Sequence, residues 1–510
     1  HYRPKAKIAR YDSHLKKLGK FAPRHFRQFD QDVQMSGSEK STLTHDTQFF
    51  YGLGAAPYGI KDNGFSYFLL IFYSQVLGLS PVMTSAALSI AIIVDAITDP
   101  IIGYISDNWR SRWGRRHPFM YLAIVPICVS YAYMWNPPTD VMASEQALFV
   151  YLVAMAVTVR IFLTFFEVPN TALISELTED YDARTKLMGL RYMFGWLGGI
   201  GMAFLAYSVF LRETEGGGGG ILAAAGYGYY GIAAACLMFV GMLVSSLGTH
   251  RHIGRLHVPP VRDKIKLAQV FGELLETMKN RSFQSLFLAS IFSGTAAGMQ
   301  AALSIYFSTF FWGLKASELA IFPIFQALAA CCAVPIAHIL GKRFDKKRAA
   351  IGSFVFMISF GPLMLFGRLA DIVPENDSPL MLPMLLAHNF VEVCVIIVFS
   401  ILFGAMMADV VEDSAVDTTR RSEGVIFAAR GFAGKMVSGL GILLAGVILA
   451  AANLPRDAAP EDVDEQVLVD LVLYAAPGQI LLYSLALLMI TRYRISRKKH
   501  NENITQLSIS

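Results

Sequence analysis

Two aspartates, Asp95 and Asp99, stand four residues apart near the end of a long apolar stretch that begins at about Val82. Four residues make about one helical turn, so a helix would place both carboxylates on the same face. An ionised carboxylate inside a lipid bilayer is costly and persists only beside a cavity, a cation or a basic partner. The pair therefore predicts a binding site for a coupling cation.

The hydroxyls of Thr98 and Thr164 are candidate neutral ligands at this site. Carboxylate and hydroxyl oxygens suit a hard monovalent cation or a proton, so these residues do not distinguish Na⁺ from H⁺. In this interpretation the two aspartates repel each other when no cation is bound and hold the site open. A second interpretation stays open, in which the pair only neutralises Lys435 or Arg191 and fixes helix packing.

Further ionisable groups lie inside apolar stretches and need partners there. Arg160 and Glu167 are spaced to share one helical face with Thr164. Asp62 and Glu167 are predicted to accept hydrogen bonds from substrate hydroxyls, unless they only form ion pairs with neighbouring basic residues. Arg191 is either a substrate ligand or a latch of an inner gate.

Only 16% of the 510 residues are charged, 54% are hydrophobic, and the mean hydropathy is +0.45. Soluble domains average about 25% charged residues, so the composition indicates a protein that crosses a membrane several times. The five cysteines lie in apolar segments without metal-ligand spacing, and the sequence contains no nucleophile–base pair or phosphate-binding loop. We therefore expect no enzyme activity, no cofactor or metal beyond a coupling ion, and no nucleic-acid partner.

Twelve apolar stretches are long enough to span a bilayer core of about 30 Å. They fall into two groups of six around a polar linker: 48–78, 82–106, 118–136, 146–175, 187–211 and 222–248, then 281–312, 317–341, 348–369, 380–409, 424–452 and 468–491. The first, fourth, seventh and tenth are long and carry polar residues, so we expect them to line the transport pathway.

Lys and Arg gather in the loop after the second stretch, in the central linker, in the loop after the eighth stretch and in the tail. Positive charge marks cytoplasmic loops, so both termini are predicted to be cytoplasmic. The predicted division is a cytoplasmic arm 1–46, a six-helix half 47–248, a cytoplasmic linker 249–280, a second six-helix half 281–495 and a cytoplasmic tail 496–510.

The two halves repeat two short motifs. Gly103–Asp107 recurs as Gly341–Asp345 at an offset of 238 residues, and Glu176 recurs as Asp409 at an offset of 233. Nearly equal offsets indicate duplicated halves, as in the major facilitator architecture with its substrate site between the halves. The aspartate pair has no such copy, so the cation site is predicted in the first half only.

The repeated motifs also predict a cytoplasmic gate, in which glycine lets helix ends approach closely and acids pair with arginines. The gate residues are Gly103, Asp107, Arg115, Arg116, Glu176, Glu179, Asp345, Asp409 and Glu412.

Over about residues 47–495 the chain resembles the glycoside–pentoside–hexuronide:cation symporter family. The shared motifs are Ile60-Lys61-Asp62, Asp95 to Gly103, Ser111 to Gly114, Glu167-Val168-Pro169, Arg191, Ala408 to Glu412 and Lys435. The resemblance implies a cation site of Asp95, Thr98, Asp99 and Thr164, with Lys435 beside it. It implies a substrate site of Lys61, Asp62, Glu167 and Arg191, with which we group Arg160, Thr171 and Arg430.

The chain departs from this family where sugar binding is concerned. An aromatic residue on which the melibiose permease type stacks sugar is Thr171 here, a tryptophan of the tenth span is Ser400, and a neutral residue of the eleventh is Arg430. Losing stacking aromatics while gaining a cation favours a hexuronide or another anionic glycoside over a neutral galactoside.

The sequence thus predicts a twelve-helix transporter of a bacterial-type inner membrane that imports a sugar or glycoside with Na⁺ or H⁺ by alternating access. One alternative is a sodium-coupled lysophospholipid carrier, since such carriers share the Asp95 to Pro100 element. A non-transporting membrane sensor is a second, and it would need a large soluble domain that the sequence lacks.

Overall fold

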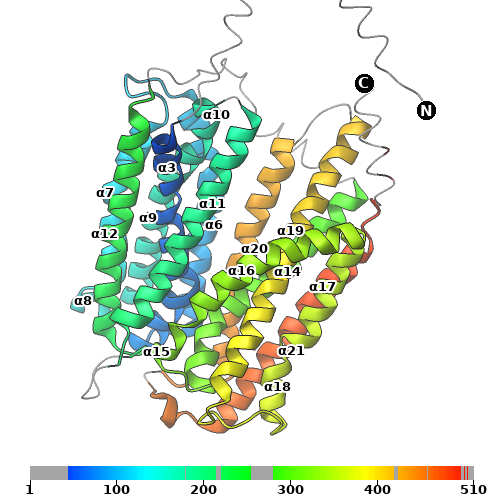
Figure 1. Ribbon diagram of the computed structural model, residues 1–510. Helices are drawn as coiled ribbons and strands as arrows, with labels where there is room; N and C mark the ends of the chain where they lie inside the picture. The colour runs from blue at the N-terminus through cyan, green and yellow to red at the C-terminus, as the bar shows by residue number, and fades with distance from the viewer. Residues whose placement is uncertain are drawn as a thin grey trace, which may run out of the picture. The chain divides into compact units, whose positions relative to one another are not determined.

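The computed structural model describes residues 44–178, 180–213, 220–253, 280–418, 423–456 and 458–495, together with 499 and 502. Every element in these residues is a helix (Figure 1). The first predicted stretch is an interrupted helix made of α3 His45–Leu53, α4 Ala56–Asn63, η1 Gly64–Phe68, α5 Leu69–Ile71 and η2 Phe72–Val76. The η1 and η2 turns are π-helical, a rare form often found at functional sites.

The rest of the first half consists of five long helices and short pieces at their ends. They are α6 Pro81–Asn108, α7 His117–Met134, α8 Thr139–Met142, α9 Glu145–Ala172, α10 Ile174–Leu177, α11 Tyr181–Leu205, η3 Ala206–Phe210 and α12 Ala224–His250. Proline opens α6 and stands near the start of α7, where its missing N–H has no helical partner to lose.

The second half follows the same plan after the central linker. Its elements are α14 Arg281–Tyr306, η5 Phe307–Phe311, α15 Ala316–Leu319, α16 Phe322–Arg343, α17 Lys346–Phe360, α18 Leu363–Leu369, α19 Met381–Thr418, α20 Glu423–Ala451, η6 Pro460–Asp462 and α21 Glu465–Thr491.

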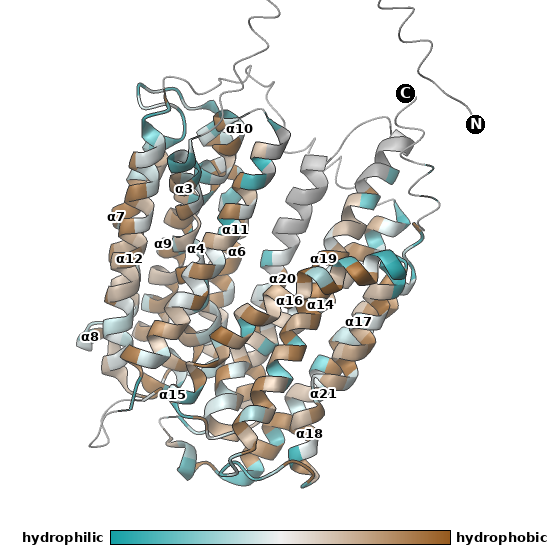
Figure 2. Ribbon diagram, viewed as in Figure 1, coloured by the Kyte–Doolittle hydropathy of each residue, from teal (hydrophilic) through white to brown (hydrophobic). Residues whose placement is uncertain are grey.

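By length and composition, ten helical segments of the described residues are able to cross a membrane. The other two predicted stretches are the interrupted first one and that of α20, whose described apolar part is Val437–Ala451. Figure 2 shows apolar residues along the long helices and hydrophilic ones mostly toward their ends. The predicted all-helical membrane architecture is confirmed, whereas the count of twelve spans stays a prediction.

Several pairs of elements join the two halves, among them two pairs of long helices, and α14 also contacts η1. α6 packs against α20, and α11 packs against α16. Within the first half, α6 also packs against α9, and α4 packs against α11. These four contacts place the charged groups of α4, α6, α9, α11 and α20 around the interface between the halves.

The ends predicted to face outward are linked across the halves. Arg456, which precedes α21, forms an ion pair of 3.1 Å with Glu145 at the start of α9 and donates to the carbonyl of Gly78. Deeper in, the hydroxyls of Ser74 and Tyr306 lie 2.5 Å apart in a buried position. These contacts hold the outer ends of the halves together in this structure.

Candidate functional site

Three charged side chains meet where α6 of the first half packs against α20 of the second. The Lys435 ammonium lies 2.9 Å from Asp95 Oδ2 and forms a second ion pair with Asp99 Oδ2. The one-turn spacing of the aspartates brings both carboxylates to the same amine. The two halves are therefore joined by a charge cluster in the middle of α6 and α20.

Asp95 has the most partners in this cluster. Its Oδ2 also accepts a hydrogen bond from Arg160 Nη1 at 3.1 Å, and its Oδ1 accepts one from the Thr164 hydroxyl at 2.9 Å. The same hydroxyl lies 3.0 Å from Asp99 Oδ1. The Asp95 side chain is 9% exposed and that of Asp99 is 32% exposed. Asp95 is thus buried and bonded to three side chains, whereas Asp99 is partly accessible.

The cluster differs from the predicted arrangement in three ways. The Thr98 hydroxyl donates to the backbone carbonyl of Asp95 at 3.1 Å rather than to a carboxylate, as hydroxyls inside helices often do. Arg160, which we grouped with the substrate site, pairs with Asp95 instead. The Lys435 ammonium stands between the two carboxylates, so the expectation that their repulsion holds the site open is wrong in this structure.

A cavity of about 480 Å³ is bounded by α4, α9 and α11 of the first half and by α16 of the second. Asp62, Glu167, Thr171 and Arg191 line it, so four of the predicted substrate residues share one cavity. Lys61 does not line it, because its side chain is only 1% exposed and its ammonium lies 3.4 Å from Asp62 Oδ1.

The Arg191 guanidinium is held by three acceptors. Its Nη2 donates to Glu167 Oε1 at 2.5 Å and to the Thr171 hydroxyl at 2.7 Å, and its Nη1 donates to Asn170 Oδ1. The central carbon of the guanidinium lies 5.3 Å from the centre of the Tyr51 ring. Arg191 therefore lies at the cavity and ties α11 to α9, while its role as substrate ligand or as latch of an inner gate stays a prediction.

Glycine permits the close approach of α4 and α11 that forms one wall of the cavity. A Cβ at Gly59 would collide with the carbonyl of Gly195, and a Cβ at Gly198 would lie 2.5 Å from the carbonyl of Ala56. Glycines at these crossings bring Asp62 of α4 to the same cavity as the residues of α11.

Most of the other lining residues were not predicted from the sequence, among them the polar and aromatic Tyr58, Tyr192, Trp196 and Gln326. Tyr192 and Trp196 stand one turn apart on α11, where the spacing of Met188, Tyr192 and Trp196 was a usable signal. Which face of α11 meets the cavity depends on its glycine contacts with α4, and that could not be read from spacing alone.

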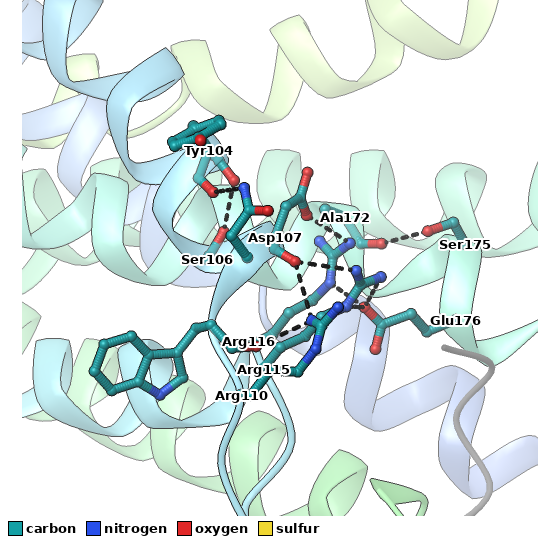
Figure 3. A network of polar contacts seen from close by, with 12 residues as sticks. Tyr104, Ser106, Asp107, Arg110, Arg115, Arg116, Ala172, Ser175 and Glu176 are labelled. Carbon is teal, nitrogen blue, oxygen red and sulfur yellow. Dashed lines mark hydrogen bonds and ion pairs between the residues drawn. The ribbon is translucent and has the colours of Figure 1, made fainter. Parts of the chain in front are cut away.

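Four of the predicted gate residues of the first half, Asp107, Arg115, Arg116 and Glu176, form one polar network at the end of α6 (Figure 3). Glu176 of α10 accepts hydrogen bonds from Arg115 at 2.7 Å and from Arg116, and Arg116 also pairs with Asp107 at 3.2 Å. In Figure 3 both arginines point from the loop after α6 toward Glu176. The network therefore ties that loop to α10.

The second half contains a matching ion pair. Lys346 lies 2.7 Å from Asp409, which is the copy of Glu176. The Tyr493 hydroxyl lies 3.4 Å from the same carboxylate. Burial and the neighbouring Asp409 raise the pKa of Tyr493, so its hydroxyl stays protonated and donates. Acids at both copies of the motif are thus paired within their own half.

The remaining gate residues either differ from the prediction or have side chains outside the described residues. A Cβ at Gly103 would meet only Val168 at 3.6 Å, and one at Gly341 would meet only Leu402 at 3.7 Å. Both are ordinary contact distances, so the predicted close approach of helix ends at these glycines is wrong in this conformation. Asp345 precedes α17 without capping it through its side chain. The side chains of Glu179, Glu412 and Arg430 lie outside the described residues.

Comparison with known proteins identifies relatives of this chain and solved structures with a similar fold. A family model described as MFS/sugar transport protein matches residues 50–497. An uncharacterised symporter of Synechocystis is 26% identical, over 93% of this chain and 98% of that protein. The isoprimeverose transporter of Lactiplantibacillus pentosus is 23% identical, over 81% of this chain and 82% of that protein.

Among solved structures, the nucleoside transporter NupG superposes with a TM-score of 0.56 at 14% identity, covering 88% of this chain and 98% of NupG. At this identity the likeness concerns the fold alone.

Proposed function

Because the chain belongs to the MFS/sugar transport protein family, we propose that it carries a sugar or glycoside across the membrane together with a cation, Na⁺ or H⁺. The family is one of transporters and not of enzymes. Relatives named as an isoprimeverose transporter and a putative glycoside/cation symporter support both the solute and the coupling.

The single observation that carries cation coupling is the position of the Lys435 ammonium between Asp95 and Asp99. A site that holds one amine between two carboxylates can exchange it for one monovalent cation at little change in net charge. Because Lys435 belongs to α20 and the aspartates to α6, such an exchange releases one half from the other. The coupling step is thus the replacement of an internal cation by an external one.

Helix α9 connects this cation site with the cavity. It carries Arg160 and Thr164, which bind Asp95, and Glu167, which binds Arg191 in the cavity. A change in the cation site that shifts α9 therefore reaches the cavity within two helical turns. Coupling of affinities is reciprocal, so substrate should tighten cation binding by the same factor as the cation tightens substrate binding.

Alternating access fits the contacts at the outer ends. The pair of Arg456 with Glu145 joins the halves there, so the exchange of substrate in this conformation takes place from the opposite side. The basic loops that follow α6 and α16 support a cytoplasmic location of that side and of both termini. We place the protein in a bacterial-type inner membrane.

The test is uptake into proteoliposomes under imposed Na⁺ or H⁺ gradients, using a panel of glycosides, hexuronides and lysolipids. We expect gradient-driven accumulation of a sugar that is lost in Asp95→Asn and Asp99→Asn. Accumulation that survives in both variants would contradict the cation site. Accumulation of lysolipids alone would contradict the sugar substrate.

The cavity is tested separately by ligand binding to Asp62→Asn and Glu167→Gln. We expect both to weaken binding of the transported sugar. Wild-type affinity in both variants would show that the substrate binds elsewhere.

A further inference from the structure

The aromatic wall of the cavity narrows the substrate class, and this inference rests on the proposed function. Tyr192 and Trp196 line the cavity from α11, while Asp62 and Glu167 line it from α4 and α9. We propose that Trp196, with Tyr192, is the surface on which the ring of an uncharged glycoside stacks, and that the cavity discriminates against hexuronides.

The shape of a sugar fits this wall. One face of a pyranose ring presents C–H groups, and its edge carries hydroxyls, so it pairs with a flat aromatic face beside polar acceptors. Tyr192 and Trp196 lie four residues apart on one face of α11. Thr171 of α9, which stands where an aromatic was expected, instead bonds Glu167 and Arg191. Helix α11 thus supplies the flat surface that α9 lacks.

The charges that line the cavity do not favour an anion. Asp62 and Glu167 are acidic and only Arg191 is basic, so the lining carries one net negative charge. Arg191 already donates to Glu167, Thr171 and Asn170. These bonds use three of its five N–H groups, so a substrate carboxylate would compete with bound acceptors beside two like charges, which is unfavourable.

The two carboxylates of the lining have hydrogen-bond acceptors to spare. The Asp62 side chain is 50% exposed, and the hydrogen bond described for its carboxylate is a long one from Lys61 at 3.4 Å. Glu167 Oε2 is buried without a hydrogen-bond partner among the described residues. An unpaired buried acceptor is costly, and sugar hydroxyls are donors that would satisfy it. A hexuronide carboxylate is itself an acceptor and would not.

This inference reverses the preference for an anionic glycoside that the sequence suggested. That preference rested on Arg430 and on the loss of stacking aromatics at other positions. The side chain of Arg430 lies outside the described residues, and the aromatics are present on α11.

The experiment compares matched sugars on the reconstituted full chain. Binding and gradient-driven uptake are measured for methyl glucoside against methyl glucuronide, and for methyl galactoside against methyl galacturonide. We expect the neutral member of at least one pair to bind about tenfold or more tightly than its acid. Asp62→Asn should narrow that ratio, because it removes one negative charge from the cavity.

The aromatic surface is tested with Trp196→Ala and with Leu197→Ala as the matched control. Leu197 is the next residue on α11 and is similarly exposed, at 57% against 50%, but it does not line the cavity. We expect Trp196→Ala to weaken neutral-glycoside binding about two- to tenfold, Trp196→Phe to restore most of it, and Leu197→Ala to leave it unchanged.

Several results would overturn the inference. Tighter binding of the acid in both pairs, or equal effects of Trp196→Ala and Leu197→Ala, would refute it while gradient-driven uptake left the proposed function standing. If no sugar were bound or accumulated under either gradient, the proposed function would fail and this inference with it.

Discussion

Replacing Asp95 with asparagine should destabilise the protein much more than the same change at Asp99. Asp95 is 9% exposed and pairs with both Arg160 and Lys435, whereas Asp99 is 32% exposed and forms its described ion pair with Lys435. The two residues differ by one helical turn and carry the same charge. Any difference between the variants therefore reports their surroundings.

The magnitude follows from the partners that each change leaves behind. Asp95→Asn leaves Arg160, whose side chain is 8% exposed, without the carboxylate 3.1 Å away, and removing one partner of a buried ion pair costs about 3–5 kcal/mol. In Asp99→Asn, Lys435 keeps Asp95, and we expect a loss of about 1–2 kcal/mol. At about 2–4 °C per kcal/mol for a unit of roughly 200 residues, Asp95→Asn should melt several degrees lower.

The assay is thermal unfolding of the purified variants in detergent, followed by intrinsic fluorescence. The double variant Asp95→Asn with Arg160→Gln should melt above Asp95→Asn alone, because it removes the buried charge that was left unpaired. Equal melting temperatures for the two single variants, or no recovery in the double variant, would refute the reasoning.

Three further changes test other parts of the structure. Lys435→Met should raise the affinity for the coupling cation by about tenfold or more, since the competing amine is removed; titration calorimetry that finds weaker binding would contradict this. Gly59→Ala should destabilise the protein by about 1–3 kcal/mol through its clash with α11, whereas Gly189→Ala, with open space around it, should be neutral or slightly stabilising in the same melting assay. Glu145→Gln should open the outer ends and raise the maleimide labelling of a cysteine at Ser74 by a factor of about two to five, and an unchanged rate would exclude a latch.

The sequence was sufficient for the architecture because bilayer-spanning helices are specified by their own residues. Apolar length, loop charge and the repeat between Gly103–Asp107 and Gly341–Asp345 all act locally along the chain. The same holds for Asp95 and Asp99, whose spacing on one helix fixes their common direction. These features needed no knowledge of which helices are neighbours.

What the sequence left open depends on contacts between helices. The spacing of Arg160 with Glu167 predicts a place in the substrate site. Helix α6 lies close enough to α9, however, for Asp95 to form an ion pair with Arg160 instead. The aromatic wall of α11 was missed because its orientation is set where Gly59 and Gly198 let α4 and α11 approach each other. Pairing partners across helices are properties of packing, which periodicity does not determine.

The duplication also bears on the prediction that only the first half carries a cation site. At the offset of 238 residues, the positions of Asp95 and Asp99 correspond to Ala333 and Ala337 on α16. Both alanines are buried in an apolar cluster with residues of α19 such as Leu402. Small apolar side chains there pack α16 firmly on α19, so this face of the second half has no charge to exchange. Both halves have an ion pair at the repeated acid, Glu176 in the first and Asp409 in the second. The aspartate pair, in contrast, occurs in the first half only. In the proposed mechanism, a transporter built in this way binds its coupling cation on α6 and moves the second half in response, through the amine that α20 contributes.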